Sequence, residues 1–537
     1  MKIRNSADER LMDVAEPVDL YTLESPHAES TEVDQKSPGE QAPAEPTKVN
    51  LRRWFGLGVG IILAIIVYLV LPGSLSHNGK LTAATAVLMG AWWMTEALPI
   101  PATALVPLII FPLLGDEIPI KDVGASYGND VIFLFMGGFM LALAMQRWNL
   151  HRRIALLTVK FMGSRTDRMI AGFMIATGFL SMWVSNTATA VMMLPIGMSV
   201  LLLVAKVAPG AGVKSVNESG ETIIKSNFAT ALMLGIAYAA SLGSLGTIIG
   251  TPPNTLLVGY LQENFGINIG FGQWMLVGMP LSIIFLVICW LLLTKVLFRP
   301  EIKEVPGGKK LIENELKALG PLSQGEIRVL IIFVLAAVSW VGVPLIFKPA
   351  PITDAGIAMI VGLLLFTVPS GTARGVRLLD WQSAVQLPWG VLLLFGGGLA
   401  LSSQFGSSGL TDWIGAQAGA LAGLSPIIII AILTTAILFL TELTSNTATA
   451  ATFLPVAGGI AIGLGMSPMI LAIPVALAAT CAFMLPVATP PNAVAYGSGY
   501  VTVGQMVKGG LWLNLIGIVL ITLTTMTLAV WVFGIVY

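Results

Sequence analysis

Two identical polar hexapeptides interrupt long apolar stretches of this chain. SNTATA begins at Ser185 and again at Ser445, and each copy is followed by Leu-Pro at the same offset. Serine, asparagine and threonine prefer helix caps to helix interiors, so each hexapeptide predicts a turn between two helices. The helix that ends there presents carbonyls with partial negative charge, and the helix that begins there presents N–H groups with partial positive charge. One turn can therefore hold a cation on one side and an anion on the other.

A second polar motif, TPPN, begins at Thr251 and again at Thr489. Proline has no N–H to donate, and it pushes the preceding residue out of the helical region, so a helix must break at each copy. Carbonyls just before the break lose their intrahelical donors and become hard oxygen ligands, which suit an alkali cation. One isolated polar residue would indicate only packing or a kink. Two motifs in matched order favour a paired site.

The order of the motifs indicates an internal repeat. FLFMGG places Phe135, and LLFGGG places Phe395, 50 residues before the serine of the following SNTATA, and TPPN comes after each hexapeptide. The basic loop before the first hexapeptide and the GSSGLTDW segment before the second are expected on opposite sides of a membrane. Two copies in opposite orientation form an inverted repeat, and such transporters place their substrate and ion sites at the repeat interface.

The elements that must position these motifs are membrane helices. The chain is 55% hydrophobic and 11% charged, with a mean hydropathy of +0.84, as in polytopic membrane proteins. A bilayer core needs about 20 apolar residues per helix, which predicts about 11 transmembrane helices here. The apolar flanks of each SNTATA are too short to span, so we expect two re-entrant helical hairpins whose turns face protein or a wet cavity. The clearest spans are expected near 54–72, 81–98, 101–115, 129–147, 326–348 and 351–369.

Composition and charge also divide the chain. The first residues are rich in Asp, Glu, Pro and Ser and predict a disordered tail. Lys and Arg concentrate in cytoplasmic loops, so Arg52 and Arg53 place the N-terminus in the cytoplasm, and the number of spans then places the C-terminus outside. The expected parts are a cytoplasmic tail (1–50), a first membrane repeat (51–300, hairpin around 167–206, broken helix at 250–254), a cytoplasmic linker (301–325) and a second membrane repeat (326–537, hairpin around 426–464, broken helix at 488–492).

The two SNT turns, the two TPPN breaks and the segment WWMTEALPIPATALVP, which begins at Trp92, resemble the divalent anion/sodium symporter family. The resemblance covers nearly the whole chain after the tail. It implies an all-α polytopic membrane protein that works by an elevator motion, as a homodimer whose protomers each have a scaffold part and a moving transport part. The implied function is sodium-coupled import of dicarboxylates of the succinate, malate and fumarate class.

The resemblance also implies site residues, carried over by motif position. One sodium site would use Ser181, Ser185, Asn186 and Gly250, and the other Thr441, Thr444, Asn446 and Ala488. Substrate carboxylates would contact Asn186, Thr187, Asn446 and Thr447, and the site would be closed by Thr251, Pro252, Thr489 and Pro490. Ser181 and Thr441 each stand four residues before the SNT serine.

Sodium coupling is also favoured by what the motifs lack. Burying the two negative charges of a dicarboxylate unpaired is prohibitive, yet no Lys, Arg or His stands in either motif or its immediate apolar flanks. Co-bound cations are the natural counter-charge, and two breaks imply at least two sodium ions. A dicarboxylate/tricarboxylate exchanger is an alternative, as is a sodium–sulfate or sodium–citrate symporter. The sequence leaves Glu442 with two interpretations: it tunes the nearby cation site, or it faces water at the hairpin tip.

Other classes of protein fit less well. The three histidines, His27, His77 and His151, fall in the predicted tail or in loops, so no membrane serine has a base for hydrolysis. No phosphate-binding loop for a primary pump occurs. We therefore expect no enzyme activity and no nucleic-acid partner. A channel stays open as an alternative, because broken helices also build selectivity filters. A sodium/proton exchanger would need midplane carboxylates, and the break motifs hold none.

Overall fold

The computed structural model describes residues 46–207, 213–216 and 222–535. The predicted disordered tail lies outside the described residues except for its last few positions. Residues from Arg52 onward form one compact unit, and this unit carries all the features below.

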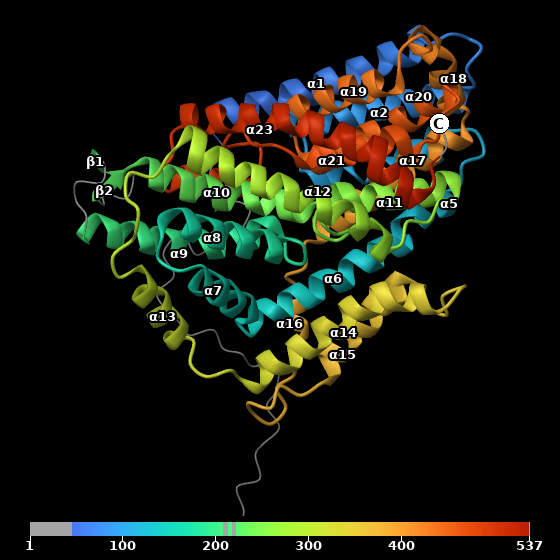
Figure 1. Ribbon diagram of the computed structural model, residues 1–537. Helices are drawn as coiled ribbons and strands as arrows, with labels where there is room; N and C mark the ends of the chain where they lie inside the picture. The colour runs from blue at the N-terminus through green and yellow to red at the C-terminus, as the bar shows by residue number, and fades with distance from the viewer. Residues whose placement is uncertain (1–45, 208–212, 217–221, 536–537) are drawn as a thin grey trace, which may run out of the picture. The chain divides into compact units, whose positions relative to one another are not determined.

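Helices account for nearly all of the regular structure in the described residues (Figure 1). The first half contains α1 (Thr47–Val70), α2 (His77–Thr95), α3 (Ile100–Thr103), α4 (Pro107–Leu114), α5 (Ile120–Ala125), η2 (Ser126–Gly128), α6 (Asp130–Arg147), α7 (Leu150–Met162), α8 (Thr166–Ser181), α9 (Asn186–Val207), α10 (Asn227–Ser244), α11 (Pro252–Phe265), α12 (Phe271–Leu291) and η3 (Leu292–Leu297). The second half contains α13 (Gly308–Ala318), α14 (Gln324–Ile346), α15 (Asp354–Thr367), α16 (Trp381–Ala384), α17 (Trp389–Ser407), α18 (Leu410–Gln417), η4 (Ala418–Leu421), α19 (Pro426–Thr441), α20 (Asn446–Gly463), α21 (Met469–Thr480), α22 (Pro490–Gly497), α23 (Val503–Thr524), η5 (Thr525–Ala529) and α24 (Val530–Phe533).

The two halves of the chain repeat one order of elements. In both, a glycine-rich helix is followed by a shorter helix, a helix–turn–helix with SNT at the turn, and a helix broken before TPPN. The first series runs from α6 to α11 and the second from α17 to α22. The internal repeat expected from the motifs is therefore present in the fold.

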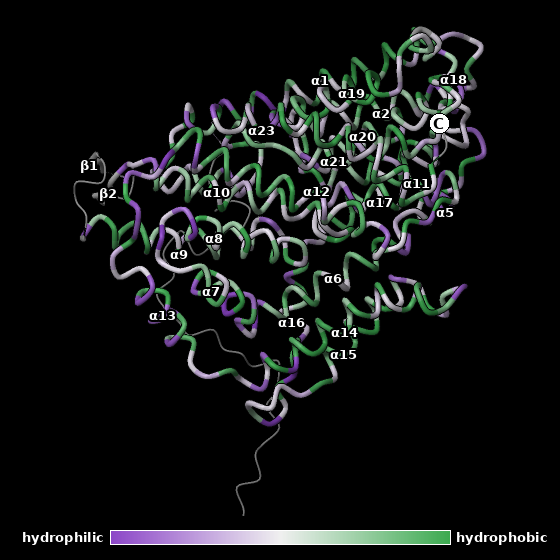
Figure 2. The backbone as a smooth tube through the Cα atoms, in the orientation of Figure 1, coloured by the Kyte–Doolittle hydropathy of each residue, from purple (hydrophilic) through white to green (hydrophobic). Residues whose placement is uncertain are grey.

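The helices are long and apolar in the way that a membrane protein requires. Eight helices in the described part are long and apolar enough to cross a bilayer, and four shorter apolar segments accompany them. In Figure 2 hydrophobic colour runs along most of these helices, while hydrophilic colour gathers on α7, α13 and the connecting segments. In α10 every residue from Phe228 to Ser244 is buried, as expected for a helix that is apolar on all sides and lies at the centre of the fold. The prediction of an all-α polytopic membrane protein is confirmed.

Three short helices stand where the sequence predicted loops. Helix α7 occupies the basic loop, α13 lies in the predicted linker, and α18 begins in the second half of the GSSGLTDW segment. Each carries charged or polar residues among apolar ones, so composition alone favoured a connection. The chain also forms a two-stranded antiparallel ribbon of β1 (Val213–Val216) and β2 (Thr222–Lys225), which hydropathy did not indicate.

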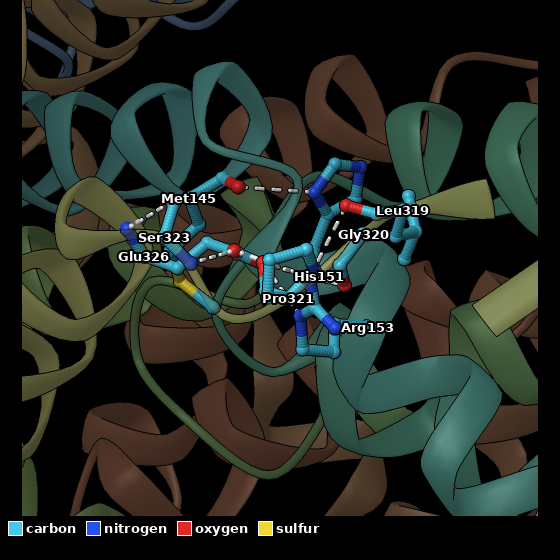
Figure 3. A network of polar contacts seen from close by, with 8 residues as sticks. All are labelled: Met145, His151, Arg153, Leu319, Gly320, Pro321, Ser323 and Glu326. Atoms are coloured by element: carbon cyan, nitrogen blue, oxygen red, sulfur yellow. Dashed lines mark hydrogen bonds and ion pairs between the residues drawn. The ribbon is translucent and has the colours of Figure 1, made fainter. Parts of the chain in front are cut away.

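A buried ion pair fixes α7 to the start of α14 (Figure 3). The Arg153 guanidinium donates to both carboxylate oxygens of Glu326, at 2.6 and 3.2 Å, and to the carbonyls of Gly320 and Pro321. Glu326 in turn accepts a hydrogen bond from the Ser323 N–H and completes the capping box of α14. A bidentate pair with its remaining donors satisfied holds a fixed geometry, so α7, the helix that precedes the first SNT hairpin, is anchored to α14.

Helices α8 and α10 pack at a glycine-to-glycine crossing. A Cβ atom placed on Gly243 would lie 2.1 Å from the Gly178 carbonyl oxygen and 2.4 Å from the Gly178 Cα. Both atoms belong to the backbone, so no side-chain rotation relieves the clash. The first SNT turn and the first break therefore approach each other because neither helix carries a side chain at this contact.

Replacing Gly243 by alanine should destabilise the protein by about 2–3 kcal/mol, because the added methyl group forces two backbones apart in a packed core. Thermal unfolding of the purified protein in detergent measures this as a fall in Tm. Gly342→Ala in α14 is the matched control, since no atom lies within 4 Å of its added Cβ and alanine favours a helix by up to about 1 kcal/mol. Equal melting temperatures for Gly243→Ala and the unmodified protein would contradict the crossing.

Candidate functional site

One cavity of about 940 Å³ is lined by both SNT turns and both TPPN breaks. Four helices begin at its wall: α9, α11, α20 and α22 start at Asn186, Pro252, Asn446 and Pro490. The first N–H groups of a helix have no intrahelical partner and carry partial positive charge. Because α11 and α22 each begin with two prolines, which have no N–H, the first N–H groups at the cavity come from α9 and α20, and they give it a surface suited to an anion.

Behind each SNT turn, three oxygen atoms meet at the end of the preceding helix. In the first repeat the Ser181 Oγ lies 2.6 Å from the Asn186 Oδ1 and 2.5 Å from the Ala240 carbonyl oxygen. In the second repeat the Thr441 Oγ1 lies 2.8 Å from the Asn446 Oδ1 and 2.9 Å from the Ala479 carbonyl oxygen.

These two oxygen clusters match atom for atom. In each, a hydroxyl with a single proton faces two acceptors, a grouping of hard oxygen atoms that a small cation would bind. The sequence did not reveal the Ala240 and Ala479 carbonyls, because any residue type supplies this group.

The helix breaks are held open by the asparagine of each TPPN motif. Asn254 donates to the Thr247 carbonyl at 2.9 Å and to the Leu245 carbonyl at 3.4 Å. Asn492 donates to the Ala482 and Leu485 carbonyls, both at 3.1 Å. These carbonyls lie in the non-helical linkers, where an intrahelical donor is missing, so each asparagine satisfies the break that its own motif creates. The motif signalled both residues, although neither was expected to have a role of its own.

The first break is tighter than the second, and a glycine allows this. The first linker has seven residues, 245–251, and the second has nine, 481–489. A Cβ atom on Gly250 would lie 2.3 Å from the Ser244 carbonyl oxygen, so only glycine fits there. Ala488 stands at the matched place in the longer linker, where its methyl group is accommodated.

The two breaks are in contact with each other. The Thr251 hydroxyl lies 3.3 Å from the Thr480 hydroxyl, and both residues are buried. Helix α22 packs on both α9 and α10, which brings elements of the two repeats together. Both repeats therefore line one cavity.

The predicted site residues come together in two groups. Ser181 and Thr441 are fully buried behind the turns, where each touches its asparagine. The Thr444 hydroxyl donates to the Leu440 carbonyl and lies 2.7 Å from the Thr449 hydroxyl. The second group consists of the predicted site residues that line the cavity, which are Ser185, Asn186, Thr187, Gly250, Thr251, Pro252, Thr444, Asn446, Thr447, Ala488, Thr489 and Pro490.

Glu442 is buried, so the interpretation that it faces water at the hairpin tip is wrong. Only 3% of its surface is exposed. Its carboxylate accepts hydrogen bonds from the N–H groups of Phe483 at 2.7 Å, Met484 at 2.9 and 3.0 Å and Leu485 at 3.3 Å, and from the Asn514 side chain at 2.8 Å. Glu442 thus holds the second linker against the second SNT turn. Whether it also tunes the cation site is left as a prediction.

The mouth of the cavity carries an ion pair that the motifs did not indicate. Arg52 and Glu96 line the cavity and form an ion pair with each other, and both are about half exposed. Phe135 and Phe139 also line the cavity, with ring centroids 4.3 Å apart. Arg52 is the single basic side chain among the lining residues, and its partner neutralises it. The walls around the breaks therefore hold no unpaired basic group in the described residues.

This arrangement of paired broken helices around one cavity defines a secondary membrane transporter. The chain belongs to the sodium:sulfate symporter family, whose transmembrane-region model matches residues 52–535. It is 42% identical over 497 residues to the sodium-dependent dicarboxylate transporter SdcS of Staphylococcus saprophyticus, covering 91% of this chain and 94% of that one. It is 43% identical over 489 residues to SdcS of Staphylococcus aureus strain USA300, covering 89% and 92%.

A solved structure supports the fold. The YdaH transporter of Alcanivorax borkumensis matches with a TM-score of 0.51 and 13% sequence identity, over 85% of this chain and 98% of that one. At this identity the likeness concerns the arrangement of helices alone. The relatives named above are transporters, in agreement with the absence of a catalytic constellation in the sequence.

Proposed function

We propose that this protein is a sodium-coupled symporter that imports C4 dicarboxylates such as succinate, malate and fumarate. The observation that carries the proposal is the pair of matched hydroxyl–amide–carbonyl clusters, one behind each SNT turn, on the two sides of a cavity formed by four helix N-termini. The names of the SdcS relatives support the same substrate class.

Two sodium ions have a natural place in the clusters. The first site would use Ser181, Ser185, Asn186 and Gly250, joined by the carbonyl of Ala240. The second would use Thr441, Thr444, Asn446 and Ala488, joined by the carbonyl of Ala479. Each ion would be coordinated by the lone pairs of these oxygen atoms, with the hydroxyl keeping its proton, and it would bring a full positive charge next to the cavity.

The anion would bind between the turns. The amides of Asn186 and Asn446 and the hydroxyls of Thr187 and Thr447 would meet its carboxylates, and Thr251, Pro252, Thr489 and Pro490, which line the same cavity, would close the site. Helix N-termini give only partial charges, so the anion should bind tightly only after sodium. This order of binding couples the two fluxes.

The large-scale arrangement follows from the same proposal. The protein would lie in the plasma or inner membrane as a homodimer in the lipid bilayer. Its N-terminus would be in the cytoplasm and its C-terminus outside. The two SNT hairpins would belong to a transport part that moves as an elevator. Anchoring of α7 on α14 by Arg153 and Glu326 would supply a fixed base for the first hairpin.

Uptake of radiolabelled succinate into proteoliposomes tests the coupling. An inward sodium gradient should drive accumulation at least tenfold above that with choline or potassium, because the unpaired dianion is excluded from the site. Equal accumulation in all three salts would rule out symport and favour an exchanger, which counter-flow from succinate-loaded vesicles would then reveal. Currents at near-diffusive rates would favour a channel.

Ligand-dependent thermal stabilisation should identify the substrate. A ligand at 100 times its Kd stabilises the folded state by about 2.7 kcal/mol, so succinate, malate or fumarate should raise Tm in sodium and not in choline. Citrate and sulfate are the matched comparisons in both salts. A larger shift with sulfate or citrate would move the assignment to the other symporters of the family.

A further inference from the structure

A basic groove lies outside the cavity, where α8 begins and α12 ends. Its volume is about 1050 Å³. The basic side chains along it belong to Arg165, Lys295, Arg299 and Lys303, and the acidic ones to Asp167 and Glu304. The groove therefore has an excess of positive charge, and it shares no residue with the transport cavity.

The backbone on one side of the groove is fixed. The Thr166 N–H donates to the Lys303 carbonyl at 3.1 Å, and the Thr166 hydroxyl donates to the Ile302 carbonyl at 2.7 Å. Arg165 and Glu304 form an antiparallel bridge beside these contacts. The segment after α12 is thus tied to the first turn of α8, and its basic side chains stand at defined positions.

The positive charges are only partly neutralised. The Asp167 carboxylate lies 3.1 Å from the Lys295 ammonium and 3.4 Å from the Arg165 guanidinium. Arg299 and Lys303 are exposed, and neither has a carboxylate within 4.0 Å in the part of the chain that the structure describes. Two cationic groups are therefore available to an external anion.

An apolar stripe leads along α12 to the groove. Ile283, Val287 and Leu291 are 53%, 48% and 42% exposed, and their spacing of four residues puts them on one face of α12, which continues into η3 with Lys295. The Lys295 ammonium also lies 5.8 Å from the ring centroid of Trp290. An apolar helix face that ends in a tryptophan and a lysine is typical of the boundary between the hydrocarbon core and the headgroups of a bilayer.

We propose that this groove binds the phosphate headgroup of an anionic phospholipid, with Arg299 and Lys303 at the phosphate and the acyl chains along Ile283, Val287 and Leu291. Basic pockets between membrane helices bind such headgroups. A free phosphate ion would use the same cations but would gain nothing from the apolar stripe. The stripe therefore favours the lipid as the occupant.

Native mass spectrometry of the detergent-purified protein, titrated with dioleoyl phosphatidylglycerol or dioleoyl phosphatidylcholine, tests the proposal. The unmodified protein should retain phosphatidylglycerol preferentially, and the double variant Arg299→Gln, Lys303→Gln should retain it about tenfold less, because each basic side chain at the headgroup contributes attraction. Dioleoyl phosphatidylglycerol should also raise the Tm of the unmodified protein and leave that of the double variant unchanged.

The double variant Lys309→Gln, Lys310→Gln in α13 is the matched control. It removes the same charge from exposed positions outside the groove, and it should bind phosphatidylglycerol like the unmodified protein. Equal losses in both double variants, or no loss in the first, would overturn the proposal. Displacement of phosphatidylglycerol by inorganic phosphate at equal concentration would overturn it in favour of a free-anion site. Lipid retention is measured without transport, so its outcome is independent of the proposed function.

Discussion

Replacing Asn446 by alanine is expected to reduce sodium-driven succinate uptake about 100-fold or more while the protein remains folded. The Asn446 Oδ1 faces the Thr441 hydroxyl at 2.8 Å, and the same side chain lines the cavity. On the proposed function, one truncation thus removes an oxygen from the second sodium site and a donor from the anion site. A hydrogen bond to a charged group contributes about 1.5–3 kcal/mol, and losing two such contacts accounts for the expected factor.

The measurement is the initial rate of labelled succinate uptake in proteoliposomes, normalised to protein recovered as a single symmetric peak in size-exclusion chromatography. Asn186→Ala should show a similar loss, because the first repeat holds the same cluster. Asn264→Ala is the matched control: this asparagine is half-buried and donates to the Ser402 hydroxyl outside the cavity. Uptake at the normal rate in either SNT variant would refute the assignment of the site.

The parts of the site that are built from turn-forming or helix-breaking residues could be predicted from the sequence. SNT turns and TPP breaks are costly inside apolar helices, so their positions in the sequence alone indicate where α8 and α19 end and where α11 and α22 begin. The predicted span 129–147 likewise matches α6 (Asp130–Arg147), and 326–348 matches α14 (Gln324–Ile346) within two residues. Periodicity and proline chemistry are local, and local signals suffice for such elements.

What the sequence left out depends on contacts between distant parts of the chain. The Ala240 and Ala479 carbonyls belong to residues with no distinguishing side chain, so only packing of α8 on α10 and of α19 on α21 brings them to the clusters. Helices α7, α13 and α18 were missed for a related reason. Their apolar faces are stabilised by burial against neighbouring elements, and hydropathy averaged over a window does not report that burial.

The two repeats differ at the position of Glu442 and in the length of the linker that this side chain contacts. The position before it, Thr441, corresponds to Ser181, so Glu442 corresponds to Met182 in the first repeat. There the linker is two residues shorter and Gly250 lets it fold directly onto the end of α10. The longer second linker has three consecutive N–H groups without helical partners, and a buried carboxylate is the acceptor that gathers all three. The Glu442 carboxylate therefore stabilises the longer second linker, whereas Gly250 allows the first linker to be short.

Glu442→Gln should accordingly raise the sodium concentration for half-maximal uptake about tenfold, equivalent to about 1.4 kcal/mol, and should lower Tm. The amide keeps one acceptor but turns an N–H₂ group toward backbone donors, so part of the linker that carries Ala488 loses its partner.

Asn514→Ala removes one donor to the same carboxylate and should have a smaller effect on both quantities. Because the two side chains share one network, the double variant should lose less than the sum of the single losses. Sodium titrations of uptake and melting curves for the unmodified protein, the two single variants and the double variant measure these effects. Strictly additive losses with unchanged sodium dependence would show that Glu442 does not act on the second cation site.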